Sequence, residues 1–373
     1  MLGSKVLTLA ASRLTLDGEM AGTSTLLNAI QLPDGTTMQN LMGQLNGSPG
    51  PKIVPGRTVP VPDSVSAELQ KAIAMPYRNS EWLLDAPDAA GWRTAIAKFA
   101  AESTIGIDKV VDKLGVKVEA TTIAGVSAFI VTPPSIPAKN ANRLVVNTHG
   151  GGYIFNPGRA SLLEPAVIAA TCGVKVIEVD YRMPPDHPFP AGSDDALAVW
   201  KAALEMVPPA NIAITGGSSG GGLALSTVLR CLQEGVTPPA AVAVQTPWCD
   251  LAAVGDSLKV HEWVDNILVT YDALAARGAK LYAAGQDIAN PLLSPLRGNL
   301  KGFPPTMLVS GTRDLILSQT VLFHCKLRQA GVTADLHLME GASHFTYFVE
   351  PFAEESQDVF AEMARFLDTH LGS

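Results

Sequence analysis

Short, uninterrupted apolar runs from about residue 116 onward limit the fold more than any other feature of this sequence. They occupy residues 127–131, 144–148, 174–179, 212–215, 241–245, 306–309 and 336–339. Runs of this length without polar alternation are typical of strands buried on both faces, and so of a mainly parallel sheet. The stretches between them are amphipathic at helical spacing, as at Leu225, Val228, Leu229 and Leu232. We therefore expect an α/β fold with a mainly parallel central sheet flanked by helices.

The preceding residues divide into two parts of different character. Residues 1–62 are rich in Gly, Pro, Thr and Asn, which predicts an irregular N-terminal extension. Residues 63–115 are expected to be helical, because Trp92, Ile96 and Phe99 recur at helical spacing after Asp88, a candidate N-cap. Residues 116–373 then form the α/β domain that carries the candidate site.

The composition argues against several classes of partner. Of the 373 residues, 47% are hydrophobic and 17% are charged, which is typical of a globular protein. The net charge of −8 and the lack of a Lys/Arg run argue against nucleic acid and anionic membrane surfaces as partners. No apolar run approaches the roughly 18 residues of a membrane helix. The apolar run 6–11 is short and weakly charged for a signal peptide, so we expect a cytoplasmic location; the alternative is a periplasmic or secreted one after signal removal.

The cysteines and histidines show no spacing that would bind a metal. The 4 cysteines form no CxxC pair, and none stands near a histidine at ligand spacing: Cys172, Cys231, Cys249 and Cys325. We expect buried free thiols, although an even count leaves one disulfide open. The sequence therefore predicts neither a metal nor a cofactor.

A glycine cluster directly after the run 212–215 predicts a turn that presents a nucleophile. Residues 216–222 read Gly-Gly-Ser-Ser-Gly-Gly-Gly and lead into the amphipathic stretch around Leu225. In a strand–turn–helix of this kind the serine stands at the tip, and small neighbours let the backbone double back. Both Ser218 and Ser219 satisfy G-x-S-x-G, so spacing alone does not choose between them.

A base and an orienting acid follow in the order that such a nucleophile requires. Asp314 comes just after the run 306–309, and His344 just after the run 336–339. A serine hydroxyl is a weak nucleophile that needs a base, and the base needs a carboxylate that fixes its tautomer. Since the carboxyl ends of parallel strands meet at one edge, we expect Asp314 and His344 to form a triad with one of the two serines, Ser218 or Ser219.

A second glycine run, His-Gly-Gly-Gly at residues 149–152, follows the run 144–148. Consecutive glycines let the backbone approach a ligand and present bare N–H groups. We expect an oxyanion hole made by the N–H groups of Gly151, Gly152 and Ser219. The candidate pocket walls are aromatic: Trp82, Trp92, Tyr153, Phe155 and Trp248.

These motifs together resemble the hormone-sensitive-lipase-like family of α/β-hydrolases, the bacterial family IV esterases. The family's HGGG motif matches residues 149–152, and its GDSAGG motif matches residues 216–221 in a register that selects Ser218. Residues 180–182 and 185–191 are similar to its DYR and PEHPFPA stretches. Three positions depart from the pattern: Gly217 replaces an acidic residue, Ser219 an alanine, and Phe345 a glycine. The resemblance implies an α/β-hydrolase fold with an N-terminal helical cap at 63–115, hydrolysis of short-chain acyl esters as small-molecule substrates, and in some members a homodimer.

Two alternatives of other classes stay open at the level of sequence. The glycine–serine cluster is also similar to that of amidase-signature enzymes, which use a Ser–Ser–Lys triad. That interpretation needs an upstream lysine, and Lys139 in a turn-rich segment is the nearest candidate. The other alternative is a non-catalytic ligand receptor of the same fold. The presence of all the triad residues argues against it.

Overall fold

The computed structural model describes residues 56–77, 86 and 88–372 of the chain. The chain divides into two units, Met1–Pro60 and Val61–Ser373, and the second contains the sheet and the candidate site. The irregular extension expected at 1–62 lies almost wholly outside the described residues and stays a prediction. In the described part of the chain, no helix is long and apolar enough to cross a membrane.

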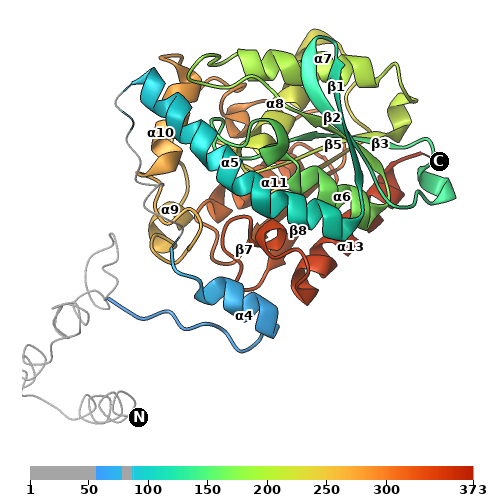
Figure 1. Cartoon of the computed structure of the whole chain (residues 1–373). Helices are drawn as coiled ribbons and strands as arrows, with labels where there is room; N and C mark the ends of the chain where they lie inside the picture. The colour runs from blue at the N-terminus through green and yellow to red at the C-terminus, as the bar shows by residue number, and fades with distance from the viewer. Residues whose placement is uncertain (1–55, 78–85, 87, 373) are drawn as a thin grey trace, which may run out of the picture. The chain divides into compact units, whose positions relative to one another are not determined.

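An eight-stranded sheet forms the centre of the second unit (Figure 1), in the order β1-β2-β4-β3-β5-β6-β7-β8. β2 pairs antiparallel with β1 and β4, and the pairs from β4 to β8 are parallel. The predicted α/β class with a mainly parallel sheet is therefore confirmed. The strands are β1 (Lys117–Ile123), β2 (Val126–Thr132), β3 (Leu144–Thr148), β4 (Lys175–Val179), β5 (Ile212–Gly217), β6 (Ala241–Gln245), β7 (Thr306–Gly311) and β8 (Ala334–Met339).

Helices cover both faces of this sheet (Figure 1), as the apolar runs predicted. One core layer joins the sheet to α7 (Ala191–Ala203), α8 (Ser219–Glu234), α10 (Leu274–Ala283) and α11 (Leu317–Gln329). The opposite layer joins it to α4 (Ala67–Ala74), α5 (Ala89–Leu114), α6 (Leu163–Cys172), α12 (Thr346–Val349) and α13 (Glu354–His370). The short helix α9 (Ser257–Val260) lies near α11. Both layers are apolar, which explains why strands β3 to β6 lack polar alternation.

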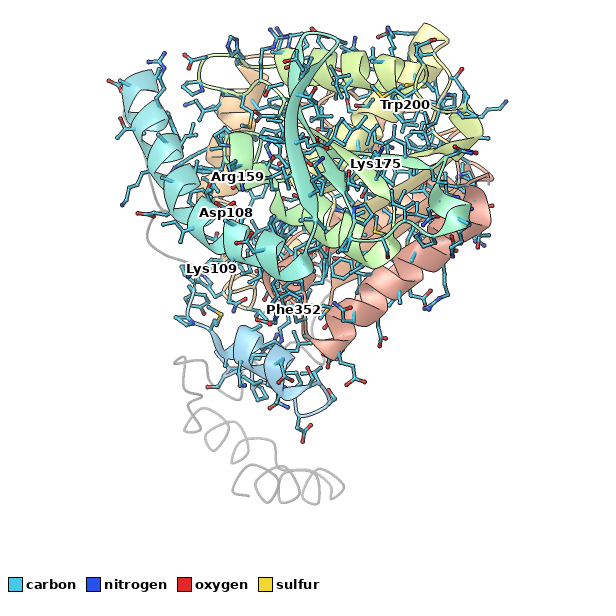
Figure 2. The ribbon with its side chains drawn as sticks, turned by 45° about the vertical axis from the view of Figure 1, so that its right-hand side comes forward. Asp108, Lys109, Arg159, Lys175, Trp200 and Phe352 are labelled. Carbon is cyan, nitrogen blue, oxygen red and sulfur yellow. The ribbon has the colours of Figure 1, made fainter. Side chains whose placement is uncertain are left out.

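The N-terminal helical region consists of α4 and the long α5. The predicted N-cap is confirmed, because the Asp88 carboxylate accepts a hydrogen bond of 2.8 Å from the Gly91 N–H. α5 packs against α6 and against the 3-10 turn η3 (Gly158–Ser161). An ion pair between Asp108 of α5 and Arg159 of η3, with an N–O distance of 2.5 Å, lies at this contact (Figure 2).

Candidate active site

Four parallel strands deliver the predicted site residues to one edge of the sheet. β3 leads to residues 149–152, β5 to Ser218, β7 to Asp314 and β8 to His344. Parallel strands end on the same side, so residues far apart in sequence meet there. The structure brings Ser218, Asp314 and His344 together in this way.

The conformation of the turn after β5 distinguishes the two serines. Ser218 has φ 56° and ψ −123°, a strained backbone that places its side chain at the tip of the turn. Ser219 begins α8 and its side chain is fully buried. A Cβ on Gly216 would lie 2.6 Å from the backbone of Gly220, and one on Gly220 would overlap the Thr148 carbonyl. Glycine is therefore required on both sides of the turn.

A hydrogen-bonded relay connects the serine to a buried carboxylate. Ser218 Oγ lies 2.9 Å from His344 Nε2, and His344 Nδ1 lies 3.0 Å from Asp314 Oδ1. Asp314 is 0% exposed, and it accepts further bonds from the Ser310 hydroxyl at 2.6 Å and the Ile316 N–H at 3.0 Å. These bonds fix the carboxylate, which in turn orients the imidazole. Such an arrangement can remove the proton from a serine hydroxyl.

The lysine that the amidase interpretation requires is not part of this site, and neither is the imidazole of the His-Gly-Gly-Gly run. Lys139 forms an ion pair of 2.5 Å with Asp368, and its side chain is 54% exposed. His149 is 0% exposed and stacks on Tyr181 with ring centroids 4.3 Å apart. Burial lowers the pKa of His149, which favours its neutral form. His149 therefore belongs to the scaffold under the loop.

The loop after β3 presents backbone N–H groups beside the serine. Gly151 and Gly152 have φ 121° and 64°, and both line the same cavity as Ser218. Among the described residues, none accepts a hydrogen bond from the N–H groups of Gly151, Gly152 or Ser219. A Cβ on Gly151 would lie 2.5 Å from the Phe155 carbonyl oxygen, so this approach also depends on glycine. Free donors beside a nucleophile can stabilise a developing oxyanion.

An apolar cavity of about 340 Å³ opens above Ser218 and His344. Among its described lining residues, Glu164 and His344 are the ionisable side chains. Part of the wall comes from α5, within the segment 63–115 that was expected to form a cap, and part comes from the segment 267–268 and from α12, which the sequence did not indicate. The apolar lining residues include Phe99, Ile107, Val110, Leu163, Ile267, Leu268, Leu274, Ile316, Phe345, Phe348 and Val349.

The aromatic residues proposed as pocket walls take different places. Phe155 and Trp248 line the cavity. Tyr153 does not; it is 2% exposed and stacks on Tyr282 with ring centroids 3.9 Å apart. Trp92 is also absent from the lining and packs in a small core cluster with Phe155. Trp82 lies outside the described residues.

Sequence reasoning missed Asp265, a buried carboxylate next to the triad. Its Oδ2 accepts the N–H groups of Leu315 at 2.8 Å and His344 at 3.2 Å. Its Oδ1 accepts the N–H groups of Ile267 at 2.8 Å and Leu268 at 3.1 Å. Burial, followed by the charge of Asp314, raises the pKa of Asp265. Asp265 therefore joins the loops of the acid and the base to the wall of the cavity.

Glu164, at the start of α6, is a second buried carboxylate that the sequence did not reveal. Its Oε1 accepts the Gly150 N–H at 2.6 Å, and its Oε2 accepts the Gly217 N–H at 2.9 Å. Burial raises the pKa of Glu164 to about 8, although both N–H bonds act in the opposite direction. An isolated acidic residue beside an apolar stretch gives no local signal of such a contact.

The chain is similar to known hydrolases in sequence and in structure. A family model described as alpha/beta hydrolase fold matches residues 145–348. The acetyl-hydrolase of Streptomyces hygroscopicus is 30% identical over 238 residues, which cover 63% of this chain and 79% of that protein. The ethyl acetate hydrolase of Pseudomonas putida is 27% identical over 247 residues, 64% of this chain and 77% of that protein.

Two solved structures extend this similarity over more of the chain. The crystal structure of an esterase superposes with a TM-score of 0.83 at 39% identity and covers 86% of this chain and 99% of its own. An esterase from the bacterial hormone-sensitive lipase family superposes with a TM-score of 0.67 at 26% identity and covers 82% of this chain and 99% of its own.

Proposed function

This chain belongs to the hormone-sensitive-lipase-like family of α/β-hydrolases, and on that premise we propose that it hydrolyses carboxylic esters with short acyl chains. The observation that carries the proposal is the relay Ser218–His344–Asp314, with distances of 2.9 and 3.0 Å, at an apolar cavity. The free N–H groups beside the serine support it, since acyl transfer needs an oxyanion site.

The proposed reaction is acyl transfer in two steps. His344 removes the proton from Ser218 as Oγ attacks the ester carbonyl, and the N–H groups of Gly151, Gly152 and Ser219 hold the oxyanion. His344 then gives the proton to the leaving alkoxide. Water repeats the sequence on the acyl-enzyme and releases the acid. Asp314 keeps the imidazole in the tautomer that accepts the proton at Nε2.

The size of the cavity supports a short acyl group. Its volume of about 340 Å³ is near the lower end of the range for ligand pockets, about 300–1,000 Å³. Two relatives are named for acetyl esters, the acetyl-hydrolase and the ethyl acetate hydrolase. The apolar lining favours an uncharged ester.

The role of the N-terminal helices belongs to the same proposal. α5 supplies Phe99, Ile107 and Val110 to the cavity lining, which supports residues 63–115 as a cap over the site. The homodimer implied by the resemblance and the cytoplasmic location both stay predictions.

A panel of p-nitrophenyl esters from acetate to palmitate tests the function. The wild type is expected to be fastest on acetate to butyrate, while Ser218→Ala and His344→Ala lose activity. Lys139→Ala is the matched control and is expected to keep wild-type rates, because its side chain is ion-paired with Asp368. Full activity in Ser218→Ala refutes the nucleophile, and loss of activity in Lys139→Ala alone favours the amidase chemistry.

A further inference from the structure

Glu164 connects the two glycine loops of the site through a single carboxylate. Gly150 opens the loop that carries Gly151 and Gly152, and Gly217 immediately precedes Ser218. Glu164 accepts the N–H of Gly150 at 2.6 Å through one oxygen and the N–H of Gly217 at 2.9 Å through the other. The carboxyl group therefore bridges the backbone just before the oxyanion donors and the backbone just before the nucleophile.

Close packing leaves these loops little freedom beyond that bridge. A Cβ on Gly150 would lie 3.0 Å from the Gly217 carbonyl oxygen, 3.2 Å from Ser218 Cβ and 3.3 Å from Glu164 Oε1. Glu164 is 3% exposed, so its carboxyl group is almost wholly enclosed by the protein. Glu164 is also the second residue of α6, whose following residues are buried in the core. A rigid element thus holds the carboxylate in place.

Gly217 and Phe345, two of the positions that differ from the family motif, lie next to each other. A Cβ on Gly217 would overlap the Phe345 ring and would lie 3.0 Å from Glu164 Oε2. The Phe345 ring therefore fills the space where a side chain at 217 would begin. The carboxylate that contacts the backbone of residue 217 comes from α6 and not from residue 217 itself.

We propose that Glu164 is a positioning residue that aligns the oxyanion donors with Ser218 by binding the backbone of both loops. The inference rests on the proposed esterase function. Glu164 makes no hydrogen bond to Ser218, His344 or Asp314, and its carboxyl oxygens bind the N–H groups of Gly150 and Gly217 instead, so its effect passes through these two glycines. Misalignment of a catalytic donor by about 1 Å can cost on the order of 10²-fold in rate. Such a loss appears in the transition state and leaves binding of the ground-state ester nearly unchanged.

Two substitutions test this role against a purely structural one. Glu164→Gln keeps the shape but turns an amide donor toward one of the two N–H groups. Glu164→Asp keeps the carboxyl group but is too short to reach both loops. We expect kcat on p-nitrophenyl butyrate to fall on the order of 10²-fold in each, with KM within about threefold of wild type. The inhibition constant of a trifluoromethyl ketone, which forms an oxyanion on Ser218, is expected to rise in parallel.

The matched control is Asp195→Asn, which removes another buried carboxylate. Asp195 is 4% exposed, accepts hydrogen bonds from Arg182 and makes no hydrogen bond to either glycine loop. It is expected to lower the melting temperature and leave kcat and the ketone inhibition constant unchanged.

The outcomes separate failure of this inference from failure of the proposed function. If either Glu164 variant keeps wild-type kcat and ketone affinity while its melting temperature falls, Glu164 is structural only. If Glu164→Gln does not fold, Glu164→Asp decides the question. A wild-type protein that hydrolyses none of the esters overturns the proposed function itself.

Discussion

Replacing Asp265 by Asn perturbs the junction between the acid loop, the base loop and the cavity wall. The carboxylate is 0% exposed, and each of its oxygens accepts two backbone N–H bonds. Asparagine has one accepting oxygen, so it can bind only one of these two pairs of N–H groups. We expect it to keep the local pair, Ile267 and Leu268, because side chains of this kind readily bond to the backbone two and three residues ahead.

The amide nitrogen of the variant then faces the N–H groups of Leu315 and His344. Two buried donors without an acceptor cost about 1–3 kcal/mol each, or about 2–6 kcal/mol together. Burial disfavours the ionised form of Asp265, and the neutral asparagine does not carry this penalty. This difference offsets part of the cost. The expected net loss in the free energy of unfolding is therefore about 1–4 kcal/mol. Because the two loops carry Asp314 and His344, kcat is expected to fall on the order of 10²-fold.

Urea denaturation followed by fluorescence measures the stability, and p-nitrophenyl butyrate hydrolysis measures kcat. Asp250→Asn is the control, since Asp250 is 1% exposed and accepts bonds from Arg297 and the Ala252 N–H instead. The control is expected to lose stability but not kcat. An Asp265→Asn protein with wild-type kcat would refute the reasoning, whatever its stability.

Two further predictions concern the glycine and the glutamate beside the nucleophile. Gly217→Ala is expected to lower both the melting temperature and kcat, because its methyl group would overlap the Phe345 ring. Adding Phe345→Ala in the same chain should restore part of both. A Gly217→Ala protein with wild-type melting temperature and kcat would contradict the overlap. Burial raises the pKa of Glu164 from 4.5 to about 8, so the unfolded chain loses this proton first as pH rises. The stability contributed by this carboxyl is therefore complete below about pH 4.5 and is lost as the pH approaches 8. The difference in melting temperature between wild type and Glu164→Gln should accordingly narrow from pH 5 to pH 9, and a constant difference would contradict the raised pKa.

The strands could be predicted from the sequence where burial on both faces removed polar residues. β3, β5 and β6 are wholly buried, so their apolar runs stood out clearly. β1 was missed because it is an edge strand whose side chains are mostly exposed or half-buried, and Lys117 and Glu119 hide its pattern. The same strand ends that could be predicted also carry the candidate triad, which explains why these residues could be named in advance.

The remaining parts of the site depend on contacts that no local pattern records. Both serines of the turn fit the spacing, so the residues alone left the choice to the register with the family motif, and in the structure the backbone conformation at Ser218 and its bond to His344 distinguish it from Ser219. The type of an aromatic residue does not reveal whether its side chain points into the core or into the cavity. Tyr153 and Trp92 pack in the core, whereas Phe155 lines the cavity. Glu164 and Asp265 act on backbone N–H groups far away in sequence.

Because α5 contributes to the cavity lining, the residues that shape the substrate space and the residues that react with the substrate lie on different elements. The reacting groups stand on strand ends after residue 148, whereas Phe99, Ser103, Gly106, Ile107 and Val110 come from one helix that precedes the sheet in the chain. Substitutions along that single helix can reshape the space for the substrate while the nucleophile, base and acid keep their geometry. Selectivity can therefore diversify through substitutions in one short, contiguous stretch of the gene.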